Sequence, residues 1–207
     1  MKNIIVEQML KYLLTNNLIS KQQHGFLSRR STATNLIESL NDWTVKMENR
    51  QGQSVAYIDF AKAFDSVSHP KLLTKLGAYG IGGVLLNWIS DFLTGRSHVT
   101  RVGHCLSPIA FITSGVIQGS CLGPLLFLLY INDLAEAISA VATMKLYADD
   151  VKLYSNMSAV PTNANVLQDQ LNRLLQWSVV WQLPISFMKC CILNIGKAVY
   201  NYCLANV

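Results

Sequence analysis

The chain has no apolar run long enough to cross a membrane. Its longest run, Leu122 to Ile131, has ten residues and contains Gly123-Pro124, whereas a membrane-spanning helix needs about 20. The first residues, Met1 to Gln8, carry charges where the apolar core of a signal peptide would lie. We therefore expect an intracellular protein, nuclear or cytoplasmic, with no targeting signal and no membrane partner.

Patterns typical of zinc sites and disulfide frameworks are also missing. The five cysteines include no C-x-x-C pair. Cys190 and Cys191 are adjacent and cannot form an ordinary disulfide bond. The four histidines have no zinc-ligand spacing with the cysteines. Reduced thiols and no zinc are expected, and the chain contains no internal repeat or low-complexity tract.

The composition is that of a folded globular protein with a basic surface. At 207 residues and 51% hydrophobic content, the chain suits one large domain or two small lobes. Its net charge is +5 and its pI is about 9.0. A polyanionic partner fits this charge, because phosphate contacts dominate nucleic-acid affinity. An ordinary, slightly basic protein is the alternative.

Two adjacent carboxylates, Asp149 and Asp150, interrupt a β-prone apolar run from Val141 to Tyr154. The pattern predicts two strands joined by a tight acidic turn. Neighbouring aspartates repel each other, and sheet formation does not require them. Mg²⁺ prefers hard oxygen ligands, often one or two carboxylates with substrate phosphates. A metal site is therefore one interpretation, and a solvated acidic turn is the other.

A second acidic strand, Ser54 to Phe60, favours the metal site. It places Asp59 at the end of an apolar strand, far from Asp149 and Asp150 in the sequence. A two-metal site needs carboxylates from at least two backbone segments. The sequence therefore predicts that the two segments meet.

Hydrophobic periodicity and turn residues predict the remaining elements. Helices are expected over Ile4 to about Asn17, Ser31 or Thr32 to about Asn49, Lys71 to Tyr79, Val84 to Leu93, Pro124 to Ile138 and Val166 to Trp181, with a turn and cap at Pro161 to Asn165. Paired strands are expected over Arg96 to Gly103 and Ile109 to Thr113 across a turn at Cys105 to Pro108. A helix-turn-helix reader of DNA is disfavoured, because the segment from Val84 to Leu93 has almost no side chains suited to base edges.

Three ordered segments resemble motifs A, B and C of reverse transcriptases, most closely those of non-LTR (LINE-type) retrotransposons. They are Tyr57 to Asp65, Ser114 to Ser120 with Gly123-Pro124, and Tyr147 to Asp150. The similarity runs from about Gln23 to about Gly196. It implies an α+β fold, a right-hand polymerase palm with a ferredoxin-like split βαβ antiparallel sheet and helices on one face, plus partial fingers.

The resemblance also implies a division of the chain and a set of partners. Residues 1–50 would be partial fingers, 51–75 palm with motif A, 76–113 an insertion between fingers and palm, and 114–207 palm with motifs B, C and D. The implied activity is RNA-directed DNA synthesis with an RNA template, a DNA primer and dNTPs, using two Mg²⁺ ions that Mn²⁺ could replace.

Site residues follow from matching the motifs position by position. Asp59, Asp149 and Asp150 would bind the metal ions, and Lys189 would be the general acid for pyrophosphate. The nucleotide-binding positions would be Arg30 (with Arg29 as the alternative), Phe60, Phe64, Gln118 and Gly119, with Tyr147 and Ala148 at the primer-grip hairpin. Phe64 would be the steric gate against a 2′-hydroxyl. Asp65 is expected to be non-catalytic and to cap the following helix.

Leu183 to Cys190 and Cys191 to Ile195 resemble motif D and the closing strand of the family. Lys189 follows Met188, where the family usually has a polar residue or proline. A fingers strand and a thumb are not recognised, so this chain alone is expected to show little processive synthesis. A catalytically dead remnant or a nucleic-acid-binding module is the alternative, and an RNA-dependent RNA polymerase is a weaker one because of the aromatic Phe64.

Overall fold

The computed structural model describes residues 2–155, 164–196 and 202, and it divides into two compact units. The helical unit comprises Met1–Leu18 and Lys62–Tyr130, and the sheet unit comprises Ile19–Ala61 and Ile131–Val207. Range 1–50, expected to be partial fingers, contributes to both units. The naming of the ranges as fingers, palm and insertion stays a prediction.

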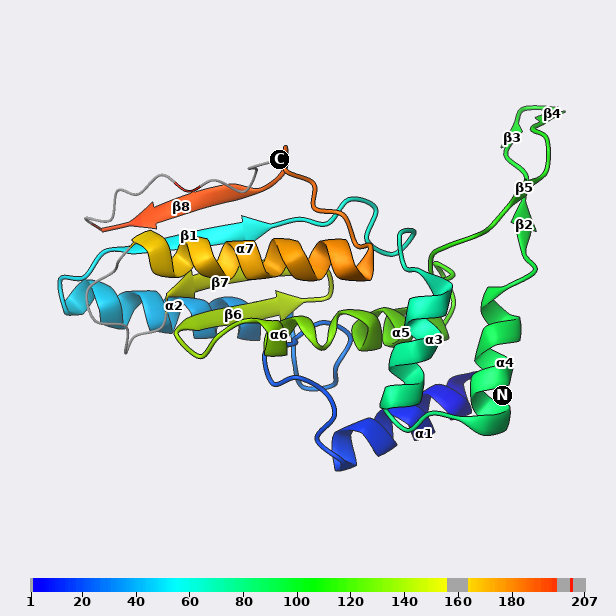
Figure 1. Ribbon diagram of the computed structural model, residues 1–207, viewed down its shortest axis with the longest axis horizontal. Helices are drawn as coiled ribbons and strands as arrows, with labels where there is room; N and C mark the ends of the chain where they lie inside the picture. The colour runs from blue at the N-terminus through cyan, green and yellow to red at the C-terminus, as the bar shows by residue number, and fades with distance from the viewer. Residues whose placement is uncertain (1, 156–163, 197–201, 203–207) are drawn as a thin grey trace. The chain divides into compact units, whose positions relative to one another are not determined.

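The sheet unit is built on a four-stranded antiparallel sheet (Figure 1). Its strands are β1 (Gln53–Ile58), β6 (Ala142–Tyr147), β7 (Asp150–Ser155) and β8 (Cys191–Ile195), in the order β6-β7-β1-β8. The two acidic segments meet at the central pair, where Ile58 of β1 lies opposite Val151 of β7. The predicted α+β fold with an antiparallel sheet is confirmed, and so is the adjacency of Asp59 to the Asp149-Asp150 hairpin.

Helices α2 (Thr32–Glu48) and α7 (Ala164–Trp181) pack on the sheet, α7 on its near side and α2 on its far side in Figure 1. Side chains of a strand alternate between the two faces. On β7, Lys152 and Tyr154 point toward α2, where Lys152 Nζ lies 2.6 Å from Asn35 Oδ1 and Tyr154 donates to Asp42 Oδ2 at 2.7 Å. The other face is apolar and buried: Met144, Leu146, Val151 and Leu153. Helix α7, from the range expected to be palm, thus covers one face, and α2, from the range expected to be partial fingers, covers the other.

The start of α2 follows from its sequence. Ser31 is the N-cap, its side chain accepts from the Thr34 backbone N–H, and the Thr34 hydroxyl accepts from the Ser31 backbone N–H. This reciprocal pair satisfies two of the N–H groups that a helix start leaves free. The predicted helix start at Ser31 or Thr32 is confirmed.

The helical unit contains α1 (Lys2–Thr15), α3 (His69–Ala78), α4 (Gly83–Leu93) and most of α5 (Leu122–Ile131). Within the described ranges, no helix combines the length and apolarity needed to cross a membrane. Pro124 falls in the first turn of α5, as expected. The predicted helices in this unit are confirmed within a few residues at most ends.

The long helix predicted from Pro124 to Ile138 is wrong. α5 ends at Ile131, and a separate short helix, α6 (Leu134–Ala137), follows. The two residues between them bond to other parts of the sheet unit: the Asn132 side chain accepts from the Ser20 N–H, and the Asp133 carboxylate accepts from Trp177 Nε1 at 3.0 Å. These long-range bonds favour the break, and apolar periodicity does not reveal them.

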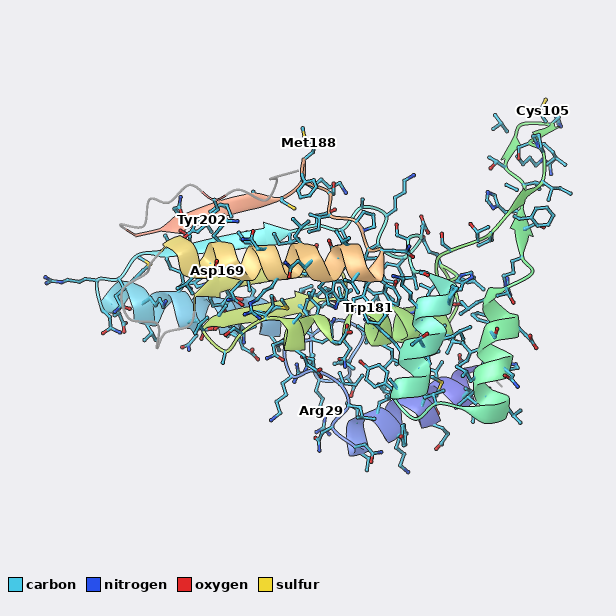
Figure 2. The ribbon with its side chains drawn as sticks, viewed as in Figure 1. Arg29, Cys105, Asp169, Trp181, Met188 and Tyr202 are labelled. Atoms are coloured by element: carbon cyan, nitrogen blue, oxygen red, sulfur yellow. The ribbon has the colours of Figure 1, made fainter. Side chains whose placement is uncertain are left out.

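The turn of the hairpin after α4 was predicted at Cys105 to Pro108, and this position is wrong. Strand β2 (Ser97–His98) pairs with β5 (Ala110–Phe111), and β3 (Arg101–Val102) pairs with β4 (Cys105–Leu106). The turn therefore lies at Gly103-His104, where Gly103 has a φ of 60°, and Cys105 is part of a strand near the tip (Figure 2). Glycine adopts positive φ at little cost, which explains the position of the turn.

The motif B glycine Gly115 should not tolerate a side chain. Its φ is 91°, and an added Cβ would lie 2.9 Å from Asp65 Cα. We expect Gly115→Ala to lower the free energy of unfolding by about 1–3 kcal/mol. Gly77→Ala is the matched control, because Gly77 is helical and a Cβ there meets nothing within 4 Å; it should stabilise by about 0.5–1 kcal/mol. Urea denaturation measures both, and equal effects would contradict this account.

Candidate active site

Asp59 lies just past the end of β1, and its backbone is fixed by the loop that precedes β8. The Ser186 N–H donates to the Asp59 carbonyl at 2.8 Å, and the Ala61 N–H donates to the Pro184 carbonyl at 2.7 Å. Phe60 forms an antiparallel bridge with Ile185 between these two bonds. The strand containing Asp59 is thus continued by contacts with the predicted motif D loop, which limits the movement of the carboxylate.

Lys189, the predicted general acid, lies beside this carboxylate. Its Nζ is 3.4 Å from Asp59 Oδ1, and the lysine side chain is 67% exposed against 32% for the aspartate. An ion pair this exposed adds little stability, so the fold does not require it. Met188, where the sequence departs from the family, is 98% exposed and points away from the sheet (Figure 2). The unusual residue therefore does not stop Lys189 from reaching Asp59.

Asp149 and Asp150 lie at the turn of the β6–β7 hairpin. Tyr147 pairs with Asp150, which leaves Ala148 and Asp149 as a two-residue loop. Ala148 has a φ of 55°, and such short hairpin loops require positive φ at one or both central residues. The turn is normally made by glycine or asparagine. An alanine in this conformation shows that other contacts hold the turn.

Burial and neighbouring charges act on the two aspartates of the hairpin. Burial raises the pKa of Asp149 above its usual value, and the negative charges of Asp150 and Asp59 raise it further, while Lys189 opposes them. Burial also raises the pKa of Asp150, and the charge of Asp59 adds to this effect. Lys152 works in the opposite direction on Asp150. Half-buried aspartates that repel one another are costly to ionise, and a bound cation would remove that cost.

The arrangement suits a metal site completed by a substrate. Within residues 2–155, 164–196 and 202, no group of three or more His, Cys, Asp or Glu side chains could hold a metal ion. Mg²⁺ commonly takes one or two carboxylates and completes its octahedron with phosphate oxygens and water. Asp59, Asp149 and Asp150 do not form a complete metal site by themselves, but their carboxylate oxygens suit an ion whose coordination a substrate completes.

Two further predicted residues of the sheet unit are held by the protein itself. Arg30 donates through one guanidinium nitrogen to the carbonyls of Lys21 and Gln23. Phe60 is 2% exposed, and its ring packs 6.1 Å from that of Trp177. A nucleotide could therefore contact only the backbone of Phe60 and not its ring. The role of Arg30 stays a prediction, with part of its guanidinium already engaged.

The helical unit joins the end of motif A to the motif B loop. The Phe64 ring stacks on Phe127 of α5 with centroids 4.3 Å apart and planes at 15°. The Val116 N–H donates to the Phe64 carbonyl at 2.8 Å, and His69 Nε2 lies 2.8 Å from the Gly115 carbonyl oxygen. Phe64, the predicted steric gate, is half-buried. The loop beside it is thus set by direct contacts with motif A.

Gln118 and Gly119, the predicted nucleotide-binding residues of motif B, are both exposed. Gln118 Nε2 donates to Asp65 Oδ1 at 2.8 Å. Gly119 has a φ of 78°, and a Cβ there would meet nothing within 4 Å. The space around Gly119 is open, which is compatible with a ligand close to its backbone. Both roles stay predictions.

The expectation that Asp65 caps the following helix is wrong. Helix α3 begins at His69, its N-cap is Ser68, and that cap has no side-chain hydrogen bond. The Asp65 carboxylate instead accepts from Gln118, and its backbone carbonyl accepts from Ser114 Oγ at 2.9 Å. Asp65 was missed as a partner of motif B, because nothing in one sequence links two residues so far apart.

Asp65→Asn should keep most of the activity, whereas Asp65→Ala should reduce it. Asparagine keeps an oxygen that can accept from Gln118, and alanine removes it. A neutral hydrogen bond contributes about 0.5–1.5 kcal/mol, so we expect a loss of roughly 2- to 10-fold for alanine in single-nucleotide addition. Complete loss in the asparagine variant would contradict a positioning role for Asp65.

Comparison with known proteins identifies the family. A family model described as reverse transcriptase (RNA-dependent DNA polymerase) matches residues 1–200. An RNA-directed DNA polymerase from the mobile element jockey of Drosophila funebris is 28% identical over 96% of this chain and 22% of its own length. The corresponding jockey protein of Drosophila melanogaster is 29% identical over 92% of this chain and 21% of its own length. The chain thus spans about a fifth of these relatives.

Solved structures agree in fold. Telomerase from Candida tropicalis, in complex with a fragment of telomeric RNA, superimposes with a TM-score of 0.66 at 12% identity, over 93% of this chain and 33% of the telomerase chain. The apo form from the same organism superimposes with a TM-score of 0.65 at 10% identity, over 95% of this chain and 36% of the telomerase chain.

Reverse transcriptases generally use divalent metal ions. By the match over residues 1–200, the chain belongs to the reverse transcriptase family, of the type that non-LTR retrotransposons encode.

Proposed function

We propose that this chain is the part of a retrotransposon reverse transcriptase that transfers a dNMP to a primer 3′-hydroxyl, with Asp59, Asp149 and Asp150 as its metal ligands. The observation that carries the proposal is the meeting of these carboxylates at one end of the central strand pair, where the charge of Asp59 raises the pKa of both Asp149 and Asp150. Nothing in the packing of the sheet requires acidic residues there.

The carboxylates would hold two Mg²⁺ ions together with the triphosphate. Two such ions supply activation of the primer hydroxyl and charge neutralisation at the leaving pyrophosphate. The chain's own residues would mainly hold the reacting groups in position, as in phosphoryl transfer generally. Lys189 Nζ, 3.4 Å from Asp59 Oδ1, would donate a proton to the pyrophosphate as it leaves.

Selection of the nucleotide would fall to the motif A and motif B residues of the helical unit. Phe64 would contact the sugar, and its stacking on Phe127 keeps the ring from turning away. Gln118, oriented by Asp65, and the open backbone at Gly119 would contact the base and template. The substrates would be dNTPs, an RNA template and a DNA primer, which the net charge of +5 favours.

Addition of one nucleotide tests the proposal. The 207-residue chain is incubated with Mg²⁺, an RNA template and an annealed DNA primer, and dNTPs and rNTPs are supplied in parallel. We expect template-directed addition of the complementary dNMP, less of the rNMP, and none with EDTA. Addition that ignores the template base, or that persists in EDTA, would contradict the proposed function.

A further inference from the structure

The side chain of Gln23 bonds to the turn that carries Asp149. Gln23 is 2% exposed. Its Oε1 accepts from the Ala148 N–H at 2.9 Å and from the Gly25 N–H at 2.7 Å, and its Nε2 donates to the Ala148 carbonyl at 3.3 Å. One buried amide therefore satisfies both backbone groups of the residue that precedes the catalytic pair.

The backbone around Gln23 adds to this contact. The His24 N–H donates to the Leu146 carbonyl at 2.8 Å, and the Leu146 N–H donates to the Gln22 carbonyl at 2.9 Å. Gln23 and Leu146 thus form a parallel bridge. The segment from Gln22 to Gly25 runs along β6 to its end, and there Gly25 comes so close that an added Cβ would lie 2.4 Å from the Ala148 nitrogen.

Ala148 needs such support. Its φ of 55° is unfavourable for a residue with a Cβ and costs about 1–2 kcal/mol. It is 5% exposed, so water cannot easily satisfy its N–H and carbonyl groups. A buried polar group left without a partner costs about 1–3 kcal/mol. The two bonds between Gln23 and Ala148 offset both costs and hold the turn in this conformation.

We propose that Gln23 is a positioning residue for catalysis: it fixes the backbone of Ala148 and thereby the direction in which Asp149 presents its carboxylate. The inference rests on the proposed role of Asp149 as a metal ligand. It assigns a function to the segment from Gln22 to Gly25, which lies outside the three segments that resemble motifs A, B and C. A change in the backbone conformation of Ala148 would move Asp149 without altering the Asp149 side chain itself.

Gln23→Leu tests the proposal with two readouts on the 207-residue chain. Hydrogen exchange of the Ala148 amide, followed by NMR, should accelerate at least about 10-fold, because a hydrogen bond worth about 1.4 kcal/mol is lost. Mn²⁺ affinity, measured by electron paramagnetic resonance in the presence of a dNTP, should fall by a similar factor. Thermal unfolding of the same samples establishes that the chain is folded.

Three control variants separate positioning from general destabilisation. Leu167→Ala removes a buried side chain of α7, 3% exposed, at the start of the helix; it should lower the melting temperature and leave Mn²⁺ affinity unchanged. Gln23→Glu keeps an oxygen that can accept from both N–H groups in either protonation state, so the Ala148 amide should stay protected. Asp149→Asn removes the ligand itself and defines the affinity without it.

The outcomes distinguish this proposal from the proposed function. Gln23→Leu with unchanged Ala148 exchange, or with faster exchange but parental Mn²⁺ affinity, would overturn the positioning role. If Asp149→Asn binds Mn²⁺ as tightly as the parent, the metal assignment itself fails, and the exchange data still decide whether Gln23 holds Ala148.

If Gln23→Leu does not fold, Gly25→Ala replaces it, because the added Cβ displaces the Ala148 nitrogen and should weaken Mn²⁺ binding. Parental Mn²⁺ affinity in Gly25→Ala would also overturn the positioning role.

Discussion

Asp149→Asn is expected to abolish nucleotide addition, with a loss of at least about 1,000-fold in the rate of the single-nucleotide reaction. The substitution keeps the size of the side chain and removes one negative charge from a site where three carboxylates lie together. An amide oxygen is a weaker ligand than a carboxylate for Mg²⁺. Asp59→Asn should have the same effect, because the two segments are proposed to hold the ions jointly.

The same variant should be at least as stable as the parent at neutral pH. Burial raises the pKa of Asp149 in the folded chain above the usual value of 3.8. In the pH window between 3.8 and the higher pKa of the folded state, the folded state therefore binds more protons than the unfolded state. Stability therefore falls as the pH rises through that window, and the ionised carboxylate is a cost at pH 7. Asparagine removes the cost, which thermal unfolding at pH 7 should show as an equal or higher melting temperature.

Asp65→Asn is the matched control, because it makes the same chemical change at an exposed aspartate of motif A that is assigned to positioning. It should keep most of the activity. Loss of activity in Asp149→Asn together with a large fall in melting temperature would point to damage to the fold, and parental activity would contradict the metal assignment.

Phe64→Val should increase the use of ribonucleotides relative to deoxyribonucleotides by at least about 10-fold, which corresponds to about 1.4 kcal/mol of discrimination. An aromatic ring against C2′ of the sugar collides with a 2′-hydroxyl, and valine leaves room for it. The ring is held by its stacking on Phe127 at 4.3 Å, so its position is fixed before a nucleotide binds. Steady-state kcat/KM values for a matched dNTP and rNTP measure the ratio.

Phe127→Val is the control for this prediction. Phe127 is fully buried and forms the other half of the stack, so removing its ring should cost about 3 kcal/mol or more of stability. It leaves the Phe64 side chain in place but removes the stacking contact that holds the ring, so the sugar preference should change in the same direction as in Phe64→Val and by less. If both variants lose stability and neither changes the ratio, Phe64 is a core residue and not the steric gate.

Much of the fold could be predicted from local sequence patterns. The strands around Asp59 and Asp150, the capped start of α2 at Ser31 and the apolar face of α7 all follow from periodicity and from the chemistry of turns and caps. The acidic segments were also predicted to meet, because a two-metal site needs carboxylates from two backbone segments, and the pairing of β1 with β7 confirms this.

The wrong helix end and the missed partners of Asp65 and Gln23 have a common physical cause. The break after Ile131 depends on bonds that Asn132 and Asp133 make to distant residues. The partner of Asp65 is 53 positions away in Gln118, and the partners of Gln23 include Ala148, 125 positions away. Long-range pairs of polar side chains leave no periodic signal in a single sequence. They are therefore visible only in the folded chain.

Titration of the chain with Mn²⁺ in the presence of a dNTP tests the central claim most directly, because it measures the metal site without requiring turnover. The account predicts saturable binding that Mg²⁺ displaces, and an affinity at least about 10-fold lower in Asp59→Asn and in Asp149→Asn, with Asp65→Asn unchanged. Equal Mn²⁺ affinity in the parent and in both ligand variants would contradict it.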